Sequence, residues 1–258
     1  MKTIKRLLSA AEEWIFPQEV GCMVCGRGLP PENEGGLCMT CAALLEEQAL
    51  EQAETEREER RPSAEGLAYV RAAYPYDGVA RRLILALKFE GMRGAAEPLA
   101  ETMAGLRTGG EELVVPVPTT RRRLRERGYN QAALLAQAVA RRRGLPCAQA
   151  LTREDSRAAQ MTLPASGRAK NVEGCMRADE CVRGKRILLI DDVYTTGSTA
   201  REAARALREA GAESVGALVA ARTLVGGRGL PEFLQRSFLL AKRKGQKSAH
   251  SDREPGKL

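Results

Sequence analysis

The segment Arg186-Ile187-Leu188-Leu189-Ile190-Asp191-Asp192-Val193-Tyr194-Thr195-Thr196-Gly197-Ser198-Thr199 is the most informative part of this 258-residue chain. Its apolar, β-branched run at 187–190 predicts a strand that is buried on both faces. Two carboxylates follow where that strand is expected to end, and a turn of hydroxyl side chains and one glycine comes next. Residues 200–210 have a helical pattern, and Gly211 is placed to end the helix. The predicted order is therefore strand, acidic pair, hydroxyl-rich loop, helix.

This loop has the chemistry of a phosphate site beside a sugar site. A loop that leads into a helix N-terminus offers backbone N–H groups and the positive end of the helix dipole to a phosphate. Gly197 allows close approach of the backbone, and neighbouring hydroxyls add donors without charge. Asp191 and Asp192 would repel a phosphate, but they accept hydrogen bonds from a sugar diol. The combination favours a ribose 5-phosphate group. Candidate ligand-binding residues are Asp191, Asp192, Val193, Tyr194, Thr195, Thr196, Gly197, Ser198 and Thr199.

The ordered string Ile-Asp-Asp-Val-Tyr-Thr-Thr-Gly-Ser-Thr resembles the phosphoribosyl-pyrophosphate (PRPP) motif of type I phosphoribosyltransferases. Neither a Walker loop nor the dinucleotide Gly-x-Gly-x-x-Gly is present in this segment. The alternative is an ordinary strand end followed by a Ser/Thr N-cap. That alternative explains two acids or one Thr-Gly pair, but it does not explain the whole ordered string.

Two Cys-x-x-Cys pairs lie near the N-terminus, with twelve residues between them. This spacing, in a glycine- and proline-rich region without a secretory signal, predicts a structural zinc site with four thiolate ligands. The alternatives are disulfides, which a reducing cytosol disfavours, and unconnected thiols, which the spacing disfavours. The region has few basic or aromatic residues, so it is a poor nucleic-acid reader by itself. The predicted zinc ligands are Cys22, Cys25, Cys38 and Cys41.

Charge is unevenly distributed along the chain, whose formal net charge is +8. Residues 1–66 hold 7 Lys/Arg and 13 Asp/Glu, whereas the remaining residues hold 34 and 20. A basic body suits phosphate-rich ligands or nucleic acid, although an arginine-rich composition with solvated surfaces gives the same balance. Glu12 and Glu13 interrupt the first apolar run too early for a signal peptide. No run approaches the ~18 apolar residues of a transmembrane helix, so we expect a cytoplasmic protein without a transmembrane segment.

Five arginines in seven positions follow the short apolar strand expected at 113–118. We interpret them as a basic loop for pyrophosphate, because arginine pairs bidentately with phosphate oxygens. Two other interpretations of the same arginines are a surface that binds a DNA backbone and a solvent-exposed face that binds no ligand. The helix expected at 78–90, with Val79, Leu83, Ile84 and Leu87 inward, ends near Lys88. The polar stretch 157–171, which we interpret as a lid, contains Arg168. The anion- or DNA-binding candidates are Arg121, Arg122, Arg123, Arg125, Arg127, Lys88 and Arg168.

Several motifs in one order identify the chain as similar to the ComF family, which combines a double zinc ribbon with a phosphoribosyltransferase domain. They are the cysteine pairs, Tyr-x-Gly…Leu-Lys, Val-Pro-Val-Pro…Arg-Glu-Arg-Gly-Tyr-Asn-Gln, and Asp-Asp-Val-Tyr-Thr-Thr-Gly-Ser-Thr. The resemblance covers roughly residues 15–225 and implies an α/β fold, a twisted parallel sheet with helices on both faces. The expected division is an amphipathic helix at 1–15, a zinc ribbon at 16–45, a charged helix and linker at 46–66, a phosphoribosyltransferase-like domain at 67–225, and a basic, disordered tail at 226–258.

The resemblance implies that Asp191 and Asp192 hold the ribose hydroxyls, that the following loop holds the 5-phosphate, and that Mg²⁺ binds with PRPP. It also implies a role in natural competence, with single-stranded DNA and competence helicase or uptake proteins as partners. Asp191, Asp192 and Arg127 are the catalytic candidates. Thr195 stands where hypoxanthine-type enzymes have a catalytic aspartate, so no general base is assigned in this loop. Two hypotheses therefore remain: a PRPP-dependent transferase, and a non-catalytic accessory protein that binds single-stranded DNA.

Overall fold

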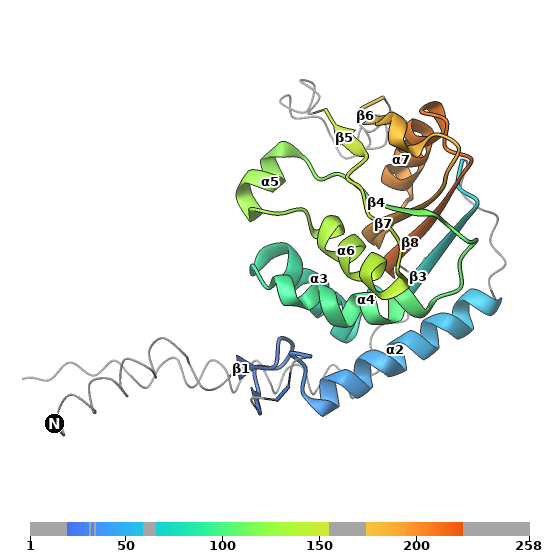
Figure 1. Cartoon of the computed structure of the whole chain (residues 1–258). Coiled ribbons are helices and arrows are strands. Elements are labelled where there is room, and N and C mark those ends of the chain that lie inside the picture. Colours follow the sequence, from blue (N-terminus) through green and yellow to red (C-terminus); the bar gives the residue numbers. More distant parts are fainter. Residues whose placement is uncertain (1–19, 31, 34, 59–65, 155–173, 224–258) are drawn as a thin grey trace, which may run out of the picture. The chain divides into compact units, whose positions relative to one another are not determined.

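A four-stranded parallel sheet forms the centre of the fold (Figure 1). The structure is a computed structural model, and it describes residues 20–30, 32–33, 35–58, 66–154 and 174–223. The strand order is β3 (Tyr69–Pro75), β8 (Ser214–Arg222), β7 (Arg186–Tyr194) and β4 (Leu113–Pro116). Strand β7 lies between two parallel neighbours, and residues 187–190 are at most 1% exposed. The predicted doubly buried strand is therefore confirmed.

Strand β7 continues four residues past the end expected from its apolar run. It does so because β8 is long enough to keep pairing with it, with Asp191 opposite Val219 and Tyr194 opposite Arg222. On the other side, β4 has already ended at Pro116, opposite Ile190. The acidic pair therefore lies within a paired strand rather than after it, at the level where one neighbouring strand has stopped.

Helices cover both faces of the sheet, as predicted. On one face, Leu188 and Ile190 pack with α3 (Gly78–Phe89), α4 (Ala96–Gly105) and α6 (Gln131–Arg143). On the other face, Ile187 and Leu189 pack with α7 (Ser198–Glu209). Alternate residues of β7 thus pack into two separate hydrophobic cores, one on each face of the sheet, as expected for a parallel sheet with helices on both faces. A 3-10 turn, η1 (Arg93–Ala95), leads into α4.

The charged segment after the second cysteine pair belongs to one helix, α2 (Met39–Glu58), which begins beside Cys38. It is not simply a solvated helix, because its Gln48 side chain is bonded to the start of α3. Gln48 Nε2 donates to the carbonyl of Asp77 at 3.0 Å, and the N–H of Ala80 donates to Gln48 Oε1 at 3.1 Å. A two-stranded ribbon, β1 (Val20–Gly21) with β2 (Gly28–Leu29), precedes it. The described residues all belong to one compact unit.

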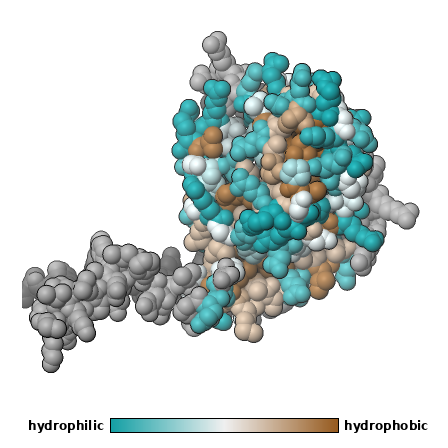
Figure 2. Space-filling view, viewed as in Figure 1, coloured by the Kyte–Doolittle hydropathy of each residue, from teal (hydrophilic) through white to brown (hydrophobic). Residues whose placement is uncertain are grey.

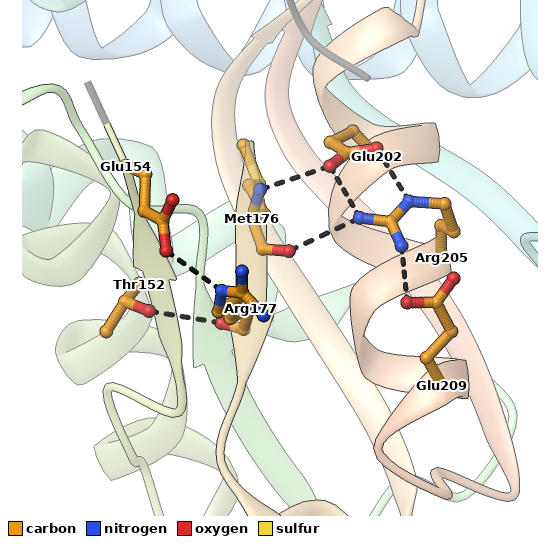
Figure 3. Close-up of polar contacts among 7 residues, drawn as sticks. All are labelled: Thr152, Glu154, Met176, Arg177, Glu202, Arg205 and Glu209. Atoms are coloured by element: carbon orange, nitrogen blue, oxygen red, sulfur yellow. Dashed lines mark hydrogen bonds and ion pairs between the residues drawn. The ribbon is translucent and has the colours of Figure 1, made fainter. Parts of the chain in front are cut away.

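A small antiparallel two-stranded sheet of β5 (Leu151–Arg153) and β6 (Met176–Ala178) lies beside α7 (Figure 3). Strand β5 is only three residues long, and before it a single bridge joins Cys147 to Val114 of β4. Both backbone groups of Met176 are bonded to side chains of α7. Its N–H donates to Glu202 Oε1 at 3.1 Å, and its carbonyl accepts Arg205 Nη2 at 3.3 Å. A 3-10 turn, η4 (Glu180–Val182), then leads toward β7.

Three expectations lie outside the described residues: the amphipathic helix at 1–15, the lid that includes Arg168, and the basic tail at 226–258. The zinc ribbon expected at 16–45 and the linker expected at 46–66 are described only in part. Across the helices that are described, none is long and apolar enough to pass through a membrane.

Candidate functional site

A cavity of about 290 Å³ opens where the strands of the sheet end. In open parallel sheets, ligands bind outside the carboxyl ends of the strands. The lining combines ends of β3, β4, β5 and β7 with residues of α3, of α6, of the loop before α7 and its first turn, and of α5 (Arg121–Arg127). Three basic and two acidic side chains face one another there. The lining residues are Tyr76, Lys88, Val117, Pro118, Thr119, Arg123, Gln131, Arg153, Asp191, Asp192, Val193, Thr195 and Thr199.

Asp192 is the buried acid of the site, with 5% of its surface exposed. Its Oδ1 accepts Lys88 Nζ at 2.8 Å, and the lysine comes from the last turn of α3. Its Oδ2 is buried and has no hydrogen-bond partner within the described residues. A buried, unpaired carboxylate oxygen costs free energy unless something donates to it. This atom therefore fits a ligand hydroxyl or a hydrated cation.

Asp191 is oriented by the backbone of its neighbour, because its Oδ1 accepts the N–H of Asp192 at 2.8 Å. Burial raises the pKa of the Asp191 carboxyl to about 7, and the charge of Asp192 adds to this effect. The backbone N–H of Asp192, Lys88 and Arg153 act in the opposite direction. A like-charged carboxylate beside it disfavours ionisation, and a cation or a donor hydroxyl favours it. The pair thus has the electrostatics of a site that binds donors or cations.

The hydroxyl-rich loop turns sharply at Gly197, whose φ is +77°. A Cβ at this position would overlap the ring of Tyr194, so both the backbone conformation and the close approach require glycine. Gly197 is the N-cap of α7 and gives it no side-chain cap. The Thr196 hydroxyl instead donates to Ser198 Oγ at 3.2 Å. The start of α7 therefore presents backbone donors and hydroxyls at the edge of the cavity.

The five arginines lie on a helix, α5, and not on the loop we expected. Thr120 caps its N-terminus, accepting from the N–H of Arg123, and Gly128 ends it in the left-handed conformation. These two capping residues are the signal that would have identified the helix. All residues of α5 except Arg127 are exposed, and hydrophilic atoms predominate over this part of the molecule in Figure 2. A helix that is polar all round has no apolar stripe to reveal it.

The structure separates the basic candidates into two groups. Lys88 and Arg123 line the cavity, whereas Arg121, Arg122 and Arg125 do not. Arg127 does not line it either: its guanidinium lies 5.1 Å from the centre of the Phe89 ring and donates to Gln131 Oε1 at 2.9 Å.

Several lining residues had no assigned role in the sequence. Thr119 follows the Val-Pro-Val-Pro strand end, and its hydroxyl oxygen is buried without a partner within the described residues. Its position after a strand end, shared with the acidic pair, is a signal that could have identified it. Gln131 is 7% exposed and is the last residue of the Gly-Tyr-Asn-Gln segment. Tyr76 directly follows β3 and is the tyrosine of the Tyr-x-Gly motif. Arg153 is brought in by β5, and no local pattern indicates this.

The four predicted zinc ligands do come together. Their sulfur atoms all lie within 4.8 Å of one another, and Cys25 Sγ and Cys38 Sγ are 3.7 Å apart. Tetrahedral Zn–S bonds of about 2.3 Å place neighbouring sulfurs about 3.8 Å apart. Burial raises the pKa of the Cys22 thiol, but backbone N–H groups of Cys25, Cys38 and Val24 outweigh burial and lower it to about 7. Burial raises the pKa of the Cys25 and Cys41 thiols, so a cation at the centre would be needed to hold all four as thiolates. The donor set thus fits a closed, four-thiolate zinc centre.

Comparison with known proteins agrees with this architecture. Residues 129–229 match the phosphoribosyl transferase domain family. The DNA utilization protein YhgH of Escherichia coli K12 is 38% identical over 132 residues, which are 49% of this chain and 57% of that relative. Competence protein ComFC of Bacillus subtilis is 28% identical over 202 residues, 74% of this chain and 72% of that protein.

The chain therefore spans little more than half the length of the Escherichia coli relative. Among solved structures, glutamine phosphoribosylpyrophosphate amidotransferase from Bacillus subtilis is 20% identical. That match covers 57% of this chain and 34% of the amidotransferase, with a TM-score of 0.39.

Proposed function

The chain belongs to the ComF family, and from this membership we propose that its cavity binds PRPP and that the protein serves DNA uptake in natural competence, in the cytoplasm. One observation carries the proposal. The acidic pair, the start of α7 and three basic side chains face a single cavity at the carboxyl ends of the strands. The acidic pair can accept hydrogen bonds from a diol, the start of α7 can donate to a phosphate, and the basic side chains can pair with a pyrophosphate.

The ribose is assigned to the acidic pair. Asp192 Oδ2 has no partner within the described residues, so a ribose hydroxyl that donates to it would satisfy a buried acceptor. The 5-phosphate is assigned to the loop from Thr195 to Thr199 and to the backbone donors at the start of α7. Gly197 permits that approach because no side chain stands between the backbone and an anion.

Pyrophosphate is assigned to the basic side of the cavity. Lys88, Arg123 and Arg153 line it, and Thr119 adds a buried hydroxyl. Their charges would stabilise pyrophosphate as it accumulates negative charge on leaving the sugar. Asp191 and Asp192 fit a hydrated Mg²⁺, since Mg²⁺ is usually held by one or two carboxylates, waters and substrate phosphates. When bound, that ion supplies charge neutralisation between ribose and pyrophosphate.

A transferase reaction would break the bond between the sugar C1 and pyrophosphate and form a bond from C1 to an acceptor. The side chains described above bind and orient PRPP for this displacement. Thr195 provides a hydroxyl and no basic group at the position where an aspartate would accept a proton from a purine. We therefore propose PRPP binding as the primary property of the site.

The ribbon is proposed to hold one structural Zn²⁺. Its hairpin turn supplies Cys22 and Cys25, and the start of α2 supplies Cys38 and Cys41. Because all four positions are thiolates, no ligand position is left for substrate, and the metal would stabilise the fold. Through α2, that stability extends to the first turn of α3.

A second candidate function is supported by the exposure of α5. A non-catalytic accessory role in binding single-stranded DNA would use arginines that project from the surface and an aromatic ring near them. Arg122 and Arg125 are exposed, and Phe89, with 69% of its surface exposed, stacks with Arg127. Basic side chains that track the backbone and aromatic rings that stack with bases are the usual components of such surfaces.

Ligand-induced thermal stabilisation tests the primary proposal. PRPP with Mg²⁺ should raise the melting temperature, because a ligand that binds only the folded state stabilises it. Ribose 5-phosphate should produce a smaller rise, and ribose without phosphate should produce none. A melting temperature that PRPP leaves unchanged at millimolar concentration would contradict PRPP binding and leave the DNA-binding function as the better account.

A further inference from the structure

The ion pair between Lys88 and Asp192 joins two elements that are far apart in the sequence. Lys88 lies in the last turn of α3, and Asp192 lies on β7. Their charged atoms are 2.8 Å apart, and the side chains are 18% and 7% exposed. Both residues line the cavity. The contact is therefore inside the proposed ligand site and not on the outer surface, where ion pairs contribute little.

Each partner keeps unused hydrogen-bonding capacity toward the cavity. A lysine ammonium has three N–H donors, and Asp192 Oδ1 is its one hydrogen-bond or ion-pair partner found within the described residues. Asp192 Oδ2 likewise has no partner there. A ligand with a diol and a pyrophosphate could thus donate to Asp192 and accept from Lys88 at the same time.

A purely structural ion pair would be arranged differently. Taking two charges out of water is costly, and the pair recovers that cost only when its remaining donors and acceptors are also bonded. Here one carboxylate oxygen, Asp192 Oδ2, has no partner among the residues that the structure describes. The arrangement is instead typical of a binding site, where the ligand completes the network.

We infer that Lys88 is a built-in counter-ion of the ribose-binding acid, which provides within the protein part of the positive charge that Mg²⁺ would otherwise bring between ribose and pyrophosphate. This inference rests on the proposed binding of PRPP. Lys88 is a positioning residue for Asp192 and a donor to pyrophosphate. Its consequence is that the protein retains PRPP affinity when divalent cations are removed, and that the retained affinity depends on the charge at position 88.

The experiment is calorimetric titration of the full chain with PRPP, once with Mg²⁺ and once with EDTA. The variants are Lys88→Met, which removes charge and donors, and Lys88→Arg, which keeps both. Lys185→Met serves as a control, because it removes one exposed lysine outside the cavity. Lys88→Gln keeps a donor to Asp192 without the charge, and it replaces the Met variant if that variant does not fold.

Wild type should bind PRPP under both conditions. The ratio of Kd in EDTA to Kd in Mg²⁺ should be about tenfold to a hundredfold larger in Lys88→Met than in wild type, as expected for loss of a charged hydrogen bond. Lys88→Arg and Lys185→Met should keep the wild-type ratio. A merely structural lysine would weaken binding equally under the two conditions and leave the ratio unchanged.

Two results would overturn the inference alone: wild type that binds PRPP with Mg²⁺ but not in EDTA, or an unchanged ratio in Lys88→Met. Absence of PRPP binding by wild type under both conditions would contradict the proposed function itself, and the inference with it. The titrations therefore distinguish the two failures.

Discussion

Asp191 and Asp192 are neighbours on one strand, yet different partners hold their carboxylates. Asp191 Oδ1 accepts the backbone N–H of Asp192, whereas Asp192 Oδ1 accepts the ammonium of Lys88, each at 2.8 Å. One acid is therefore oriented by the strand itself, and the other depends on a side chain from α3. A ligand that engages both acids would connect the centre of the sheet to α3.

The cysteine cluster gives the first prediction. Protein purified without chelator should contain one zinc per chain, and Cys25→Ser should lower the zinc content and the melting temperature, because folding of a thiolate site is coupled to its metal. Metal analysis and thermal unfolding provide the measurements. Cys181→Ser is the matched control, since Cys181 is also exposed but lies outside the cluster. Metal-free wild type with all four thiols freely titrating would contradict the site.

The turn at Gly197 gives the second prediction. Gly197→Ala should lower the free energy of unfolding for two reasons. A side chain in the left-handed backbone conformation costs about 1–2 kcal/mol, and the overlap of the new Cβ with the Tyr194 ring adds a further cost. Gly110→Ala separates the two costs, since φ is also +77° there but the space around the position is open. Urea unfolding should show the larger loss at Gly197. Equal losses would mean that the Tyr194 contact is unimportant.

The buried carboxylate of Glu202 gives a prediction for pH. Burial raises the pKa of Glu202, but hydrogen bonds from Arg205 and the N–H of Met176 outweigh burial, so its pKa is lowered overall. Its contribution to stability is therefore present above the ordinary pKa of about 4.3 and is lost as pH falls through the lower value in the folded state. Figure 3 shows the bond from Met176 on β6 to Glu202 on α7, and the bonds from Arg205 to the same carboxylate within α7.

Glu202→Gln should accordingly destabilise the protein by about 1–3 kcal/mol at pH 7, and the difference from wild type should shrink below about pH 4. Glu209→Gln removes the other acid that pairs with Arg205, but its side chain is 64% exposed. That control should cost less than about 1 kcal/mol. Denaturant unfolding at several pH values measures both. A Glu202→Gln effect independent of pH would show that the charge is irrelevant.

The arginines of α5 give a prediction that tests the DNA-binding function. Arg122→Ala with Arg125→Ala should weaken binding of single-stranded DNA and reduce the slope of log K against log salt by about 1.4, or about 0.7 per phosphate contact. Arg141→Ala with Arg142→Ala removes the same charge from α6 and is similarly compensated, because these two side chains share Glu97 and Arg122 pairs with Glu126. That control should leave the slope unchanged. Equal effects of the two double variants would place the DNA-binding surface elsewhere.

The segment from 186 to 199 shows how much could be predicted from sequence. Its buried strand, hydroxyl-rich turn and helix occur in the expected order, because each depends on local patterns, but the acidic pair lies within the strand and not after it. The extension of β7 to Tyr194 could not be predicted, since it depends on how far the distant strand β8 continues beside it. Helix α3 shows the same division between a local feature that could be predicted and a long-range contact that could not. Periodicity predicted that Val79, Leu83, Ile84 and Leu87 are buried, but nothing local indicates that Lys88 reaches Asp192.

Helix α5 was missed for a different reason. Its seven residues carry one apolar side chain, Leu124, and the arginine run led us to expect a loop. Helical periodicity is a signal of burial, and this helix buries none of its residues. Only its capping residues, Thr120 and Gly128, indicate the helix in the sequence. The cysteine cluster is the opposite case, because fixed spacing encodes the metal geometry directly.

The central claim is that the acidic pair binds the ribose of PRPP, and calorimetric titration with PRPP and Mg²⁺ tests it most directly. Asp191→Asn and Asp192→Asn should each weaken binding about tenfold to a hundredfold, as expected for loss of a charged hydrogen bond. Asp179→Asn, at an exposed helix cap outside the cavity, should bind like wild type. All three variants should be folded by circular dichroism. Wild-type affinity in folded Asp191→Asn and Asp192→Asn variants would contradict the claim.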